Sequence, residues 1–334
     1  MEASSPNPQQ IAILRWYGAN QAGIEYPLGA PPQPDASPTD MAFDGSHLWV
    51  TDVMHQTVVK LSVADGTTLG TFPMPSMNPH GNGLACDGLA IWVGNSIANT
   101  VTRLRLSDGT NLGSFPVPGN PSCLAFDGVS LWVATRSGRV TRLRVSDGRI
   151  IDGFTIAGPV NGIAFDGANL WLSSQGFVAR MSTAFPPPGS SPQQFPVGGP
   201  TAGMAFDGAN IWLLTQQPPN TVVLKLRASD GAALGTFPVG PSEPPGPMPM
   251  PNNAIAFDGA NVWVTTPIFG SQQNVPPWLQ KIASPAEFGA VTKLRASNGE
   301  NLGMFMVGRT PLGIAFDGVN IWVANQGSGT VSKI

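Results

Sequence analysis

The chain has 334 residues and a formal net charge of −3, and only 11% of its residues are charged. Roughly 25% charged residues is usual for a soluble domain, and a weakly charged surface favours self-association. The small net charge indicates neither a nucleic acid nor an anionic membrane as a partner. The 40 glycines and 34 prolines indicate many turns and few helices.

The sequence leaves the cellular compartment open. No segment is apolar for long enough to cross a bilayer, and the N-terminus lacks the basic start and apolar core of a signal peptide. The protein is therefore cytosolic, or extracellular or at the cell surface if a signal peptide has been removed. We do not expect Cys86 and Cys123 to form a disulfide, because the repeats described below place them in adjacent units with opposite facing.

Residues 1–23 are predicted to be an N-terminal extension, followed by a single domain over residues 24–334. Within the extension, residues 12–15 have the pattern of a strand. Because residues 330–334 at the C-terminus have a similar pattern, one of the two segments is surplus to the repeat. The surplus segment either packs as an extra edge strand or pairs with a neighbouring molecule and links domains into chains.

From residue 24 onward the chain repeats a unit of about 40 residues that reads as four short strands. An Ala-Phe strand ends in an Asp-Gly turn, a strand containing tryptophan follows, and then come a basic-Leu-basic strand and a Leu-Gly-Thr-Phe-Pro strand. The tryptophans of the second strands are Trp49, Trp92, Trp132, Trp171, Trp212, Trp263 and Trp322. Four-stranded units repeated radially make a β-propeller, so we predict an all-β fold with seven blades.

Two sets of repeated residues show how the ring closes. Asp-Gly pairs begin at Asp44, Asp87, Asp127, Asp166, Asp207, Asp258 and Asp317. Fourth-strand aromatics are Tyr26, Phe72, Phe115, Phe154, Phe195, Phe237 and Phe305. Tyr26 precedes every Asp-Gly pair and Asp317 has no aromatic after it, so the N-terminal strand must complete the C-terminal blade.

The repeated residues themselves are interpreted as structural. Trp and Phe are expected to fill the space between blades, and Asp to cap its own turn. The basic residues of the third strands are expected to be solvated and paired with nearby Asp. Single carboxylates a whole blade apart cannot supply the clustered oxygens that calcium needs, so no metal site is predicted there.

Binding residues are expected where the repeat is interrupted. Insertions at 241–253 and 267–289 are predicted to project from one face, which also carries the links between second and third strands. The second insertion holds Phe269, Trp278 and Lys281, an aromatic and polar set suited to a sugar, a peptide or a protein surface. Packing of the proline-rich loop on its own blade is the structural alternative.

Further candidates lie near the first blade, at the mouth of the central channel. Asp40, Asp52, His55 and His80 are predicted on one face, either as exposed polar loops or as a converging metal or acid–base site. Their spacing matches no metal motif, so no metal or cofactor is predicted. The first strands also place a mildly polar ring at the mouth, including Asn82 and Asn161.

The Ala-Phe-Asp-Gly-x-Asn-x-Trp-Val repeats resemble the bacterial seven-bladed propellers of the YVTN and virginiamycin B lyase-like (streptogramin lyase) families, over residues 24 to 334. The resemblance implies a seven-bladed propeller and, for its lyase members, a magnesium-dependent ring-opening elimination with a His general base near a Glu. The chain has no His after His80, and no catalytic residue is carried over.

Three functions follow from these features. The first is a non-catalytic scaffold or binding module, whose partner is another protein or further copies of itself as an oligomer or filament. The second is a lyase or hydrolase acting at the central mouth near Asp40, His55 and His80. The third is a carbohydrate-binding propeller that uses Trp278.

Overall fold

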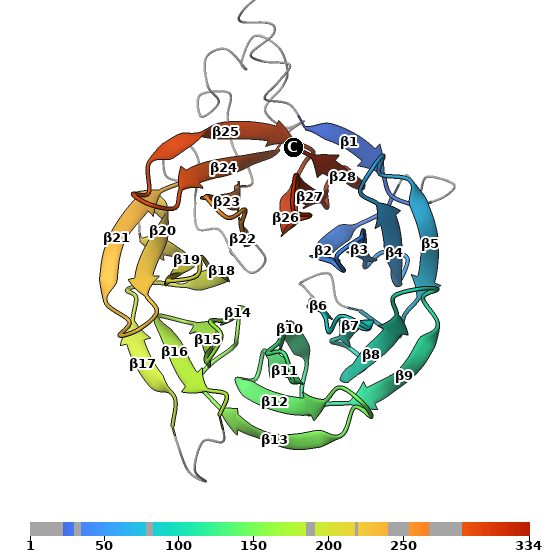
Figure 1. Cartoon of the computed structure of the whole chain (residues 1–334), viewed down its shortest axis with the longest axis horizontal. Helices are drawn as coiled ribbons and strands as arrows, with labels where there is room; N and C mark the ends of the chain where they lie inside the picture. Colours follow the sequence, from blue (N-terminus) through green and yellow to red (C-terminus); the bar gives the residue numbers. More distant parts are fainter. Residues whose placement is uncertain are drawn as a thin grey trace, which may run out of the picture.

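The computed structural model describes residues 23–29, 35–77, 83–184, 191–217, 220–239, 254–266 and 289–334. These residues form seven four-stranded antiparallel sheets arranged radially around a central channel (Figure 1). The fold is therefore the predicted seven-bladed β-propeller. The described part of the chain contains no helix that is long and apolar enough to span a membrane.

The blades are numbered in the order of their Asp-Gly turns, and the strands of each run from the channel to the rim. Blades 1 to 3 consist of β2 (Pro38–Phe43), β3 (His47–Asp52), β4 (Thr57–Ser62) and β5 (Thr68–Pro73); β6 (Leu84–Cys86), β7 (Ala90–Asn95), β8 (Thr100–Arg105) and β9 (Asn111–Pro116); and β10 (Pro121–Phe126), β11 (Ser130–Thr135), β12 (Arg139–Arg144) and β13 (Ile150–Thr155).

Blades 4 to 7 repeat the same arrangement. They consist of β14 (Gly162–Phe165), β15 (Asn169–Ser174), β16 (Phe177–Ser182) and β17 (Gln193–Pro196); β18 (Thr201–Phe206), β19 (Asn210–Gln217), β20 (Asn220–Arg227) and β21 (Ala233–Pro238); β22 (Ile255–Phe257), β23 (Asn261–Thr266), β24 (Gly289–Arg295) and β25 (Asn301–Val307); and β26 (Pro311–Phe316), β27 (Ile321–Asn325), β28 (Thr330–Lys333) and β1 (Ile24–Pro27).

The ring closes through the seventh blade, as the sequence predicts. Strand β1 pairs with β28, with Tyr26 opposite Val331, so the N-terminal strand is the outermost strand of the C-terminal blade (Figure 1). Strand β28 thereby fills the third position of this blade. Residues 12–15, the other candidate for that position, lie outside the described residues, and the strand predicted there stays a prediction.

Each Asp-Gly turn is fixed by its own carboxylate, which confirms the expected capping. In blade 5, Oδ1 of Asp207 accepts the backbone N–H groups of Ala209 and Asn210 at 2.9 and 2.6 Å. The other oxygen, Oδ2, accepts the indole N–H of Trp212 at 2.7 Å. The same indole–carboxylate bond recurs in all seven blades, at 2.6–2.8 Å.

The tryptophan of each blade is the centre of a stack. Its ring centroid lies 5.0–6.2 Å from that of the fourth-strand aromatic of the same blade. A third-strand cation lies 4.5–5.4 Å from the indole centroid on each blade. Cation–π contacts of this kind contribute about 0.5–2 kcal/mol, more as they are desolvated.

The expectation that the third-strand cations are solvated is therefore wrong for the first cation, the one over the indole, in blades 1, 3 and 5, where Lys60, Arg142 and Lys225 are buried. Lys60 is opposite Trp49 in the sheet and is only 7% exposed, and its Nζ donates to the carbonyl of Leu106 in the next blade. Lys225 does the same to Ala296. The second cation follows the prediction, as in the exposed pair of Arg144 with Asp147.

The hydrophobic core lies between adjacent blades. In one cluster Trp171 and Val178 of blade 4 pack with Ile211 and Leu213 of blade 5. The outer aromatic of one blade also packs against the Asp-Gly turn that follows the third strand of the next. A Cβ added at Gly109 would overlap the ring of Phe72, and its φ of 71° is itself unfavourable for other residues. Neighbouring blades are thus held in one fixed orientation.

Replacing a turn carboxylate should destabilise the propeller strongly. We expect Asp207→Ala to lower the free energy of unfolding by about 2–4 kcal/mol, because it leaves the buried indole N–H of Trp212 and two turn amides without their acceptor. Urea denaturation at pH 7 measures the change. The control is Asp147→Ala in an exposed turn, where the loss should stay below about 1 kcal/mol. Equal losses in the two variants would contradict the role assigned to the indole bond.

Candidate functional site

The innermost strands enclose a cavity of about 310 Å³ at the centre of the ring. Two successive positions at the start of the seven innermost strands form two rings along the channel axis, and a third ring is described in part. The first ring is apolar and consists of Met41, Leu84, Leu124, Ile163, Met204, Ile255 and Ile314. The second ring consists of Asp40, Gly83, Cys123, Gly162, Gly203, Ala254 and Gly313. Thr39, Ser122 and Asn161 represent the third ring on the cavity wall.

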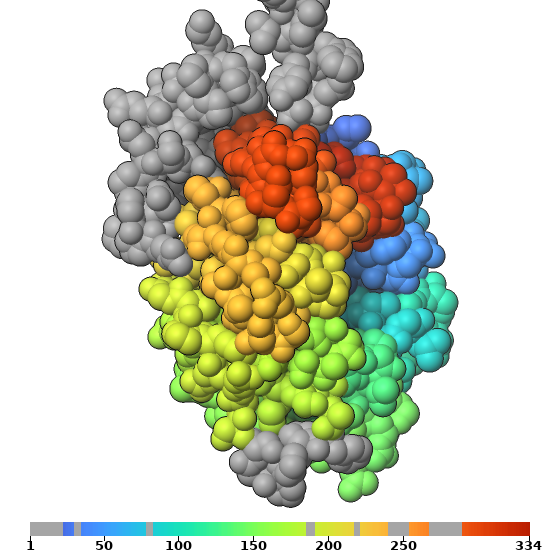
Figure 2. Space-filling view, turned by 60° about the vertical axis from the view of Figure 1, so that its left-hand side comes forward, coloured from blue at the N-terminus to red at the C-terminus, as the bar shows by residue number. Residues whose placement is uncertain are grey.

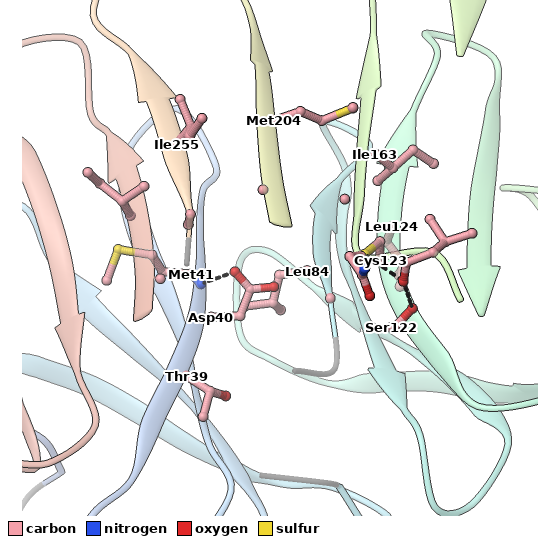
Figure 3. Close-up of a pocket in the computed structure, with 18 of the residues that line it drawn as sticks. Thr39, Asp40, Met41, Leu84, Ser122, Cys123, Leu124, Ile163, Met204 and Ile255 are labelled. Carbon is pink, nitrogen blue, oxygen red and sulfur yellow. Dashed lines mark hydrogen bonds between the residues drawn. The ribbon is translucent and has the colours of Figure 1, made fainter. Parts of the chain in front are cut away.

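Asp40 projects from β2 into this cavity (Figure 3). Its Oδ1 accepts the backbone N–H of Met41 at 2.8 Å, while its own N–H donates to Oγ1 of Thr51 at 2.9 Å. Burial raises the pKa of the Asp40 carboxyl to about 6, although hydrogen bonds from the backbone of Met41 and Leu84 oppose the rise. The carboxylate is therefore mostly ionised at neutral pH, at a cost in stability.

Cys123 occupies the equivalent position on β10. Burial raises the pKa of its thiol to about 12, the negative charge of Asp40 adds to the rise, and the Arg136 guanidinium and a hydrogen bond with Ser122 oppose it. Because the thiolate is the nucleophilic form, this thiol is a poor nucleophile at neutral pH. Both Cys86 and Cys123 are free thiols.

The polar side chains around the mouth are bonded to neighbouring blades. Oγ of Ser122 donates to the carbonyl of Val160 in the next blade at 3.0 Å. The amide of Asn161 donates to the carbonyl of Thr201 at 3.0 Å, so this predicted binding residue lines the cavity but also links blades 4 and 5. Asn82 lies outside the described residues.

The residues predicted near the first blade separate into two groups. Nδ1 of His55 lies 2.8 Å from Oδ2 of the fully buried Asp52, and Nε2 lies 3.3 Å from Oδ1 of Asp35. Oδ1 of Asp52 also accepts the N–H of Ser37 at 2.9 Å. These bonds tie the segment before β2 to the β3–β4 turn.

Asp40 belongs to a different hydrogen-bond set and faces the channel. Within the part of the chain that the structure describes, no group of three His, Cys, Asp or Glu side chains could hold a metal ion. His80 lies outside that part, as do Phe269, Trp278 and Lys281, and the roles predicted for these four residues stay predictions.

Two contributors were not predicted, namely Asp35 beside His55 and Arg136 on the cavity wall. Arg136 follows β11 in the link between the second and third strands of blade 3, so a search of such links for charged residues would have found it.

The comparisons with known proteins agree with this fold. No protein-family model and no curated protein matches the chain in sequence. The structure is similar to Kuenenia stuttgartiensis hydrazine synthase, with a TM-score of 0.69 and 13% identity over 90% of this chain and 95% of that chain. It is also similar to a streptogramin B lyase, with a TM-score of 0.65 and 16% identity over 93% of this chain and 96% of that one.

At these identities the likeness is one of fold. The protein is a seven-bladed β-propeller, the fold that the resemblance of its repeats implied and that it shares with the streptogramin B lyase structure.

Removing the Asp40 charge should stabilise the protein in a pH-dependent way. A folded-state pKa of about 6, above the ordinary 3.8, means that the folded state loses stability as pH rises from about 4 through 6. We therefore expect the difference in free energy of unfolding between Asp40→Asn and the wild type to depend on pH. This difference should favour Asp40→Asn by about 1–3 kcal/mol more at pH 8 than at pH 4.

Urea denaturation at the two pH values measures this difference. Cys123→Ser is the matched control in the same ring, because its thiol does not titrate in this range. A difference between Asp40→Asn and wild type that does not change with pH would show that the carboxyl is not perturbed by the cavity.

Proposed function

We propose that the protein is a non-catalytic, rigid scaffold whose partner is protein, and in the first place further copies of itself. The observation that carries the proposal is the rim, where the outermost strands have free edges and exposed aliphatic side chains. Figure 2 turns part of this rim toward the reader.

Five of the outer strands have no charged residue, namely β5, β9, β17, β21 and β25. Three of them, β5, β9 and β21, present an exposed leucine, with exposed fractions of 53% for Leu69, 37% for Leu112 and 43% for Leu234. Among the described residues each of these strands pairs on one side only. An exposed edge without charges is a template for pairing with another chain.

The chain also offers a candidate strand to pair with such an edge. The third position of blade 7 is filled by β28, so residues 12–15 are not needed to complete the propeller. We propose that this segment adds to the rim of a neighbouring molecule, since main-chain pairing at an exposed edge is a common mode of protein recognition.

A rigid frame suits such a role. Between blades, Oγ of Ser173 donates to the carbonyl of Ala202 at 2.7 Å, and Oγ1 of Thr265 donates to that of Leu312 at 3.2 Å. Together with the bonds of Ser122 and Asn161, these contacts use polar groups of the mouth for holding blades together.

Lyase chemistry is less well supported by the described residues. The magnesium-dependent elimination implied by the resemblance needs a metal site and a His beside a Glu. His47 lies 3.5 Å from Asp44, His55 lies between Asp52 and Asp35, and Glu300 pairs with Arg295. These residues do not fit that site, and no reaction step is derived from it. The carbohydrate hypothesis depends on Trp278 and stays a prediction.

Light scattering coupled to size exclusion tests the proposed assembly. We expect the full chain to form species larger than its monomer mass of 34.8 kDa, and deletion of residues 1–22 to leave a folded monomer. Leu112→Lys combined with Leu234→Lys should also reduce assembly, because both charges lie on rim edges.

Val319→Lys is the matched control, since Val319 is 84% exposed but lies in an Asp-Gly turn away from the rim. A full chain that stays monomeric at high concentration would refute self-assembly. Unchanged assembly after deletion of residues 1–22 would refute the role of that segment.

A further inference from the structure

The second ring of the channel departs from the sevenfold repeat at two blades. Five blades have glycine or alanine there, and blades 1 and 3 have Asp40 and Cys123. At Gly162 and Gly313 the next innermost strand approaches closely. An added Cβ would lie 2.7 Å from the carbonyl oxygen of Ala202 and 2.9 Å from Cα of Asp40, respectively. These two positions have no room for a side chain, whereas β2 and β10 carry one, so the ring provides a carboxylate on one wall.

The repeat itself does not require a carboxylate at this place, because four other blades fill the same position with glycine. The Asp40 carboxylate accepts backbone hydrogen bonds from Met41 in its own strand and from Leu84 in the next blade, while Ser122 and Asn161 join other blades at the mouth. Asp40 is half-buried in the cavity, and a carboxylate that has lost part of its water costs free energy unless a positive partner lies beside it. Asp40 is the acidic residue among the described residues of the cavity wall.

Aliphatic side chains border part of the space that Asp40 enters. Leu84, Met204 and Ile255 line the cavity beyond it and are 7–9% exposed, because most of each side chain packs between blades. Figure 3 shows these residues on the strands around Asp40. A carboxylate beside an apolar wall is complementary to a cation that carries a hydrocarbon part.

We infer that the central cavity binds a small organic ammonium ion, whose N–H groups donate to the Asp40 carboxylate while its hydrocarbon part packs on the apolar ring. The volume of about 310 Å³ lies at the lower end of the range for small-molecule sites. The guanidinium of Arg136 on the same wall carries a fixed positive charge, which disfavours a ligand with two cationic groups.

A hard metal ion fits this cavity less well. Calcium takes six to eight oxygen ligands and magnesium six in near-octahedral geometry, whereas the described wall offers one carboxylate, and the side chains of Thr39, Ser122 and Asn161 are bonded to other protein groups. The inference does not depend on self-assembly, because the rim and the channel use different strands.

Binding should depend on pH through Asp40. The titratable or charged groups facing it on the described wall are Cys123 from β10 and Arg136 from the β11–β12 turn, while β6 and β26 contribute none. The Cys123 thiol, with a pKa of about 12, and the guanidinium both keep their state between pH 5 and 8. Because an ammonium ion binds the ionised carboxylate, its affinity should fall as pH drops below about 6.

Isothermal titration of the full chain with n-butylammonium chloride tests the inference, with 1-butanol as the uncharged probe of the same shape. At pH 7.5 we expect saturable binding of one butylammonium per chain, weakened about tenfold at pH 5. Asp40→Asn and Asp40→Gly should each weaken it more than about tenfold, and Cys123→Ser should leave it within about threefold of wild type. Butanol should bind at least about tenfold more weakly and respond little to Asp40→Asn.

Asp40→Gly places in blade 1 the residue that blades 2, 4, 5 and 7 already have, so at least one of the two variants is expected to fold, and circular dichroism verifies this. Equal affinity in wild type and a folded Asp40 variant would overturn the inference. So would the absence of saturation up to about 10 mM butylammonium. Displacement of butylammonium by an equal concentration of calcium chloride would overturn it in favour of a metal site.

Discussion

The hydrogen bond from the indole N–H of tryptophan to the Asp-Gly carboxylate is the interaction on which the propeller depends. A fully buried indole needs an acceptor, and the turn carboxylate supplies one at the same place in every blade. Burial alone would raise the pKa of Asp207, but hydrogen bonds from Trp212, Asn210 and the turn amides outweigh it and hold the pKa below its usual value. Once the indole is fixed, the outer aromatic and the third-strand cation can stack on it.

The cation of the same stack also joins its blade to the next one. The ammonium of Lys225 lies 4.8 Å from the centroid of Trp212 and donates to a carbonyl of blade 6. At the closure, Lys333 lies over Trp322 and donates to the carbonyl of Val63 in blade 1. Some of the few charged residues of the chain therefore make contacts inside the protein, because one cation of each third strand lies over an indole. A frame this regular makes the two departures at Asp40 and Cys123 stand out against five equivalent positions.

The fold could be predicted from the sequence because the number of repeated residues gives the number of blades. Tyr26 precedes the first Asp-Gly pair and no outer aromatic follows Asp317, and this order determines how the ring closes. The cations over tryptophan were missed because alternation along one strand says which side chains share a face, but only the register shows that Lys60 lies opposite Trp49. The pairing of Asp52 with His55 lies within one turn and could be anticipated. The separation of Asp40 from Asp52 and His55 could not be anticipated, because it depends on how β2 packs against β6, which lies far away in the sequence.

The rim and the channel are independent parts of this structure. A ligand at Asp40 contacts the innermost strands, and the rim edges lie on the outermost strands, with two paired strands between them in every blade. Coupling between two sites requires an element with two arrangements that each site favours differently. Because inter-blade bonds and indole stacks join the described strands of every blade, we expect a ligand in the channel to leave pairing at the rim unchanged. Assembly through the outermost strands would in turn leave the innermost strands in place.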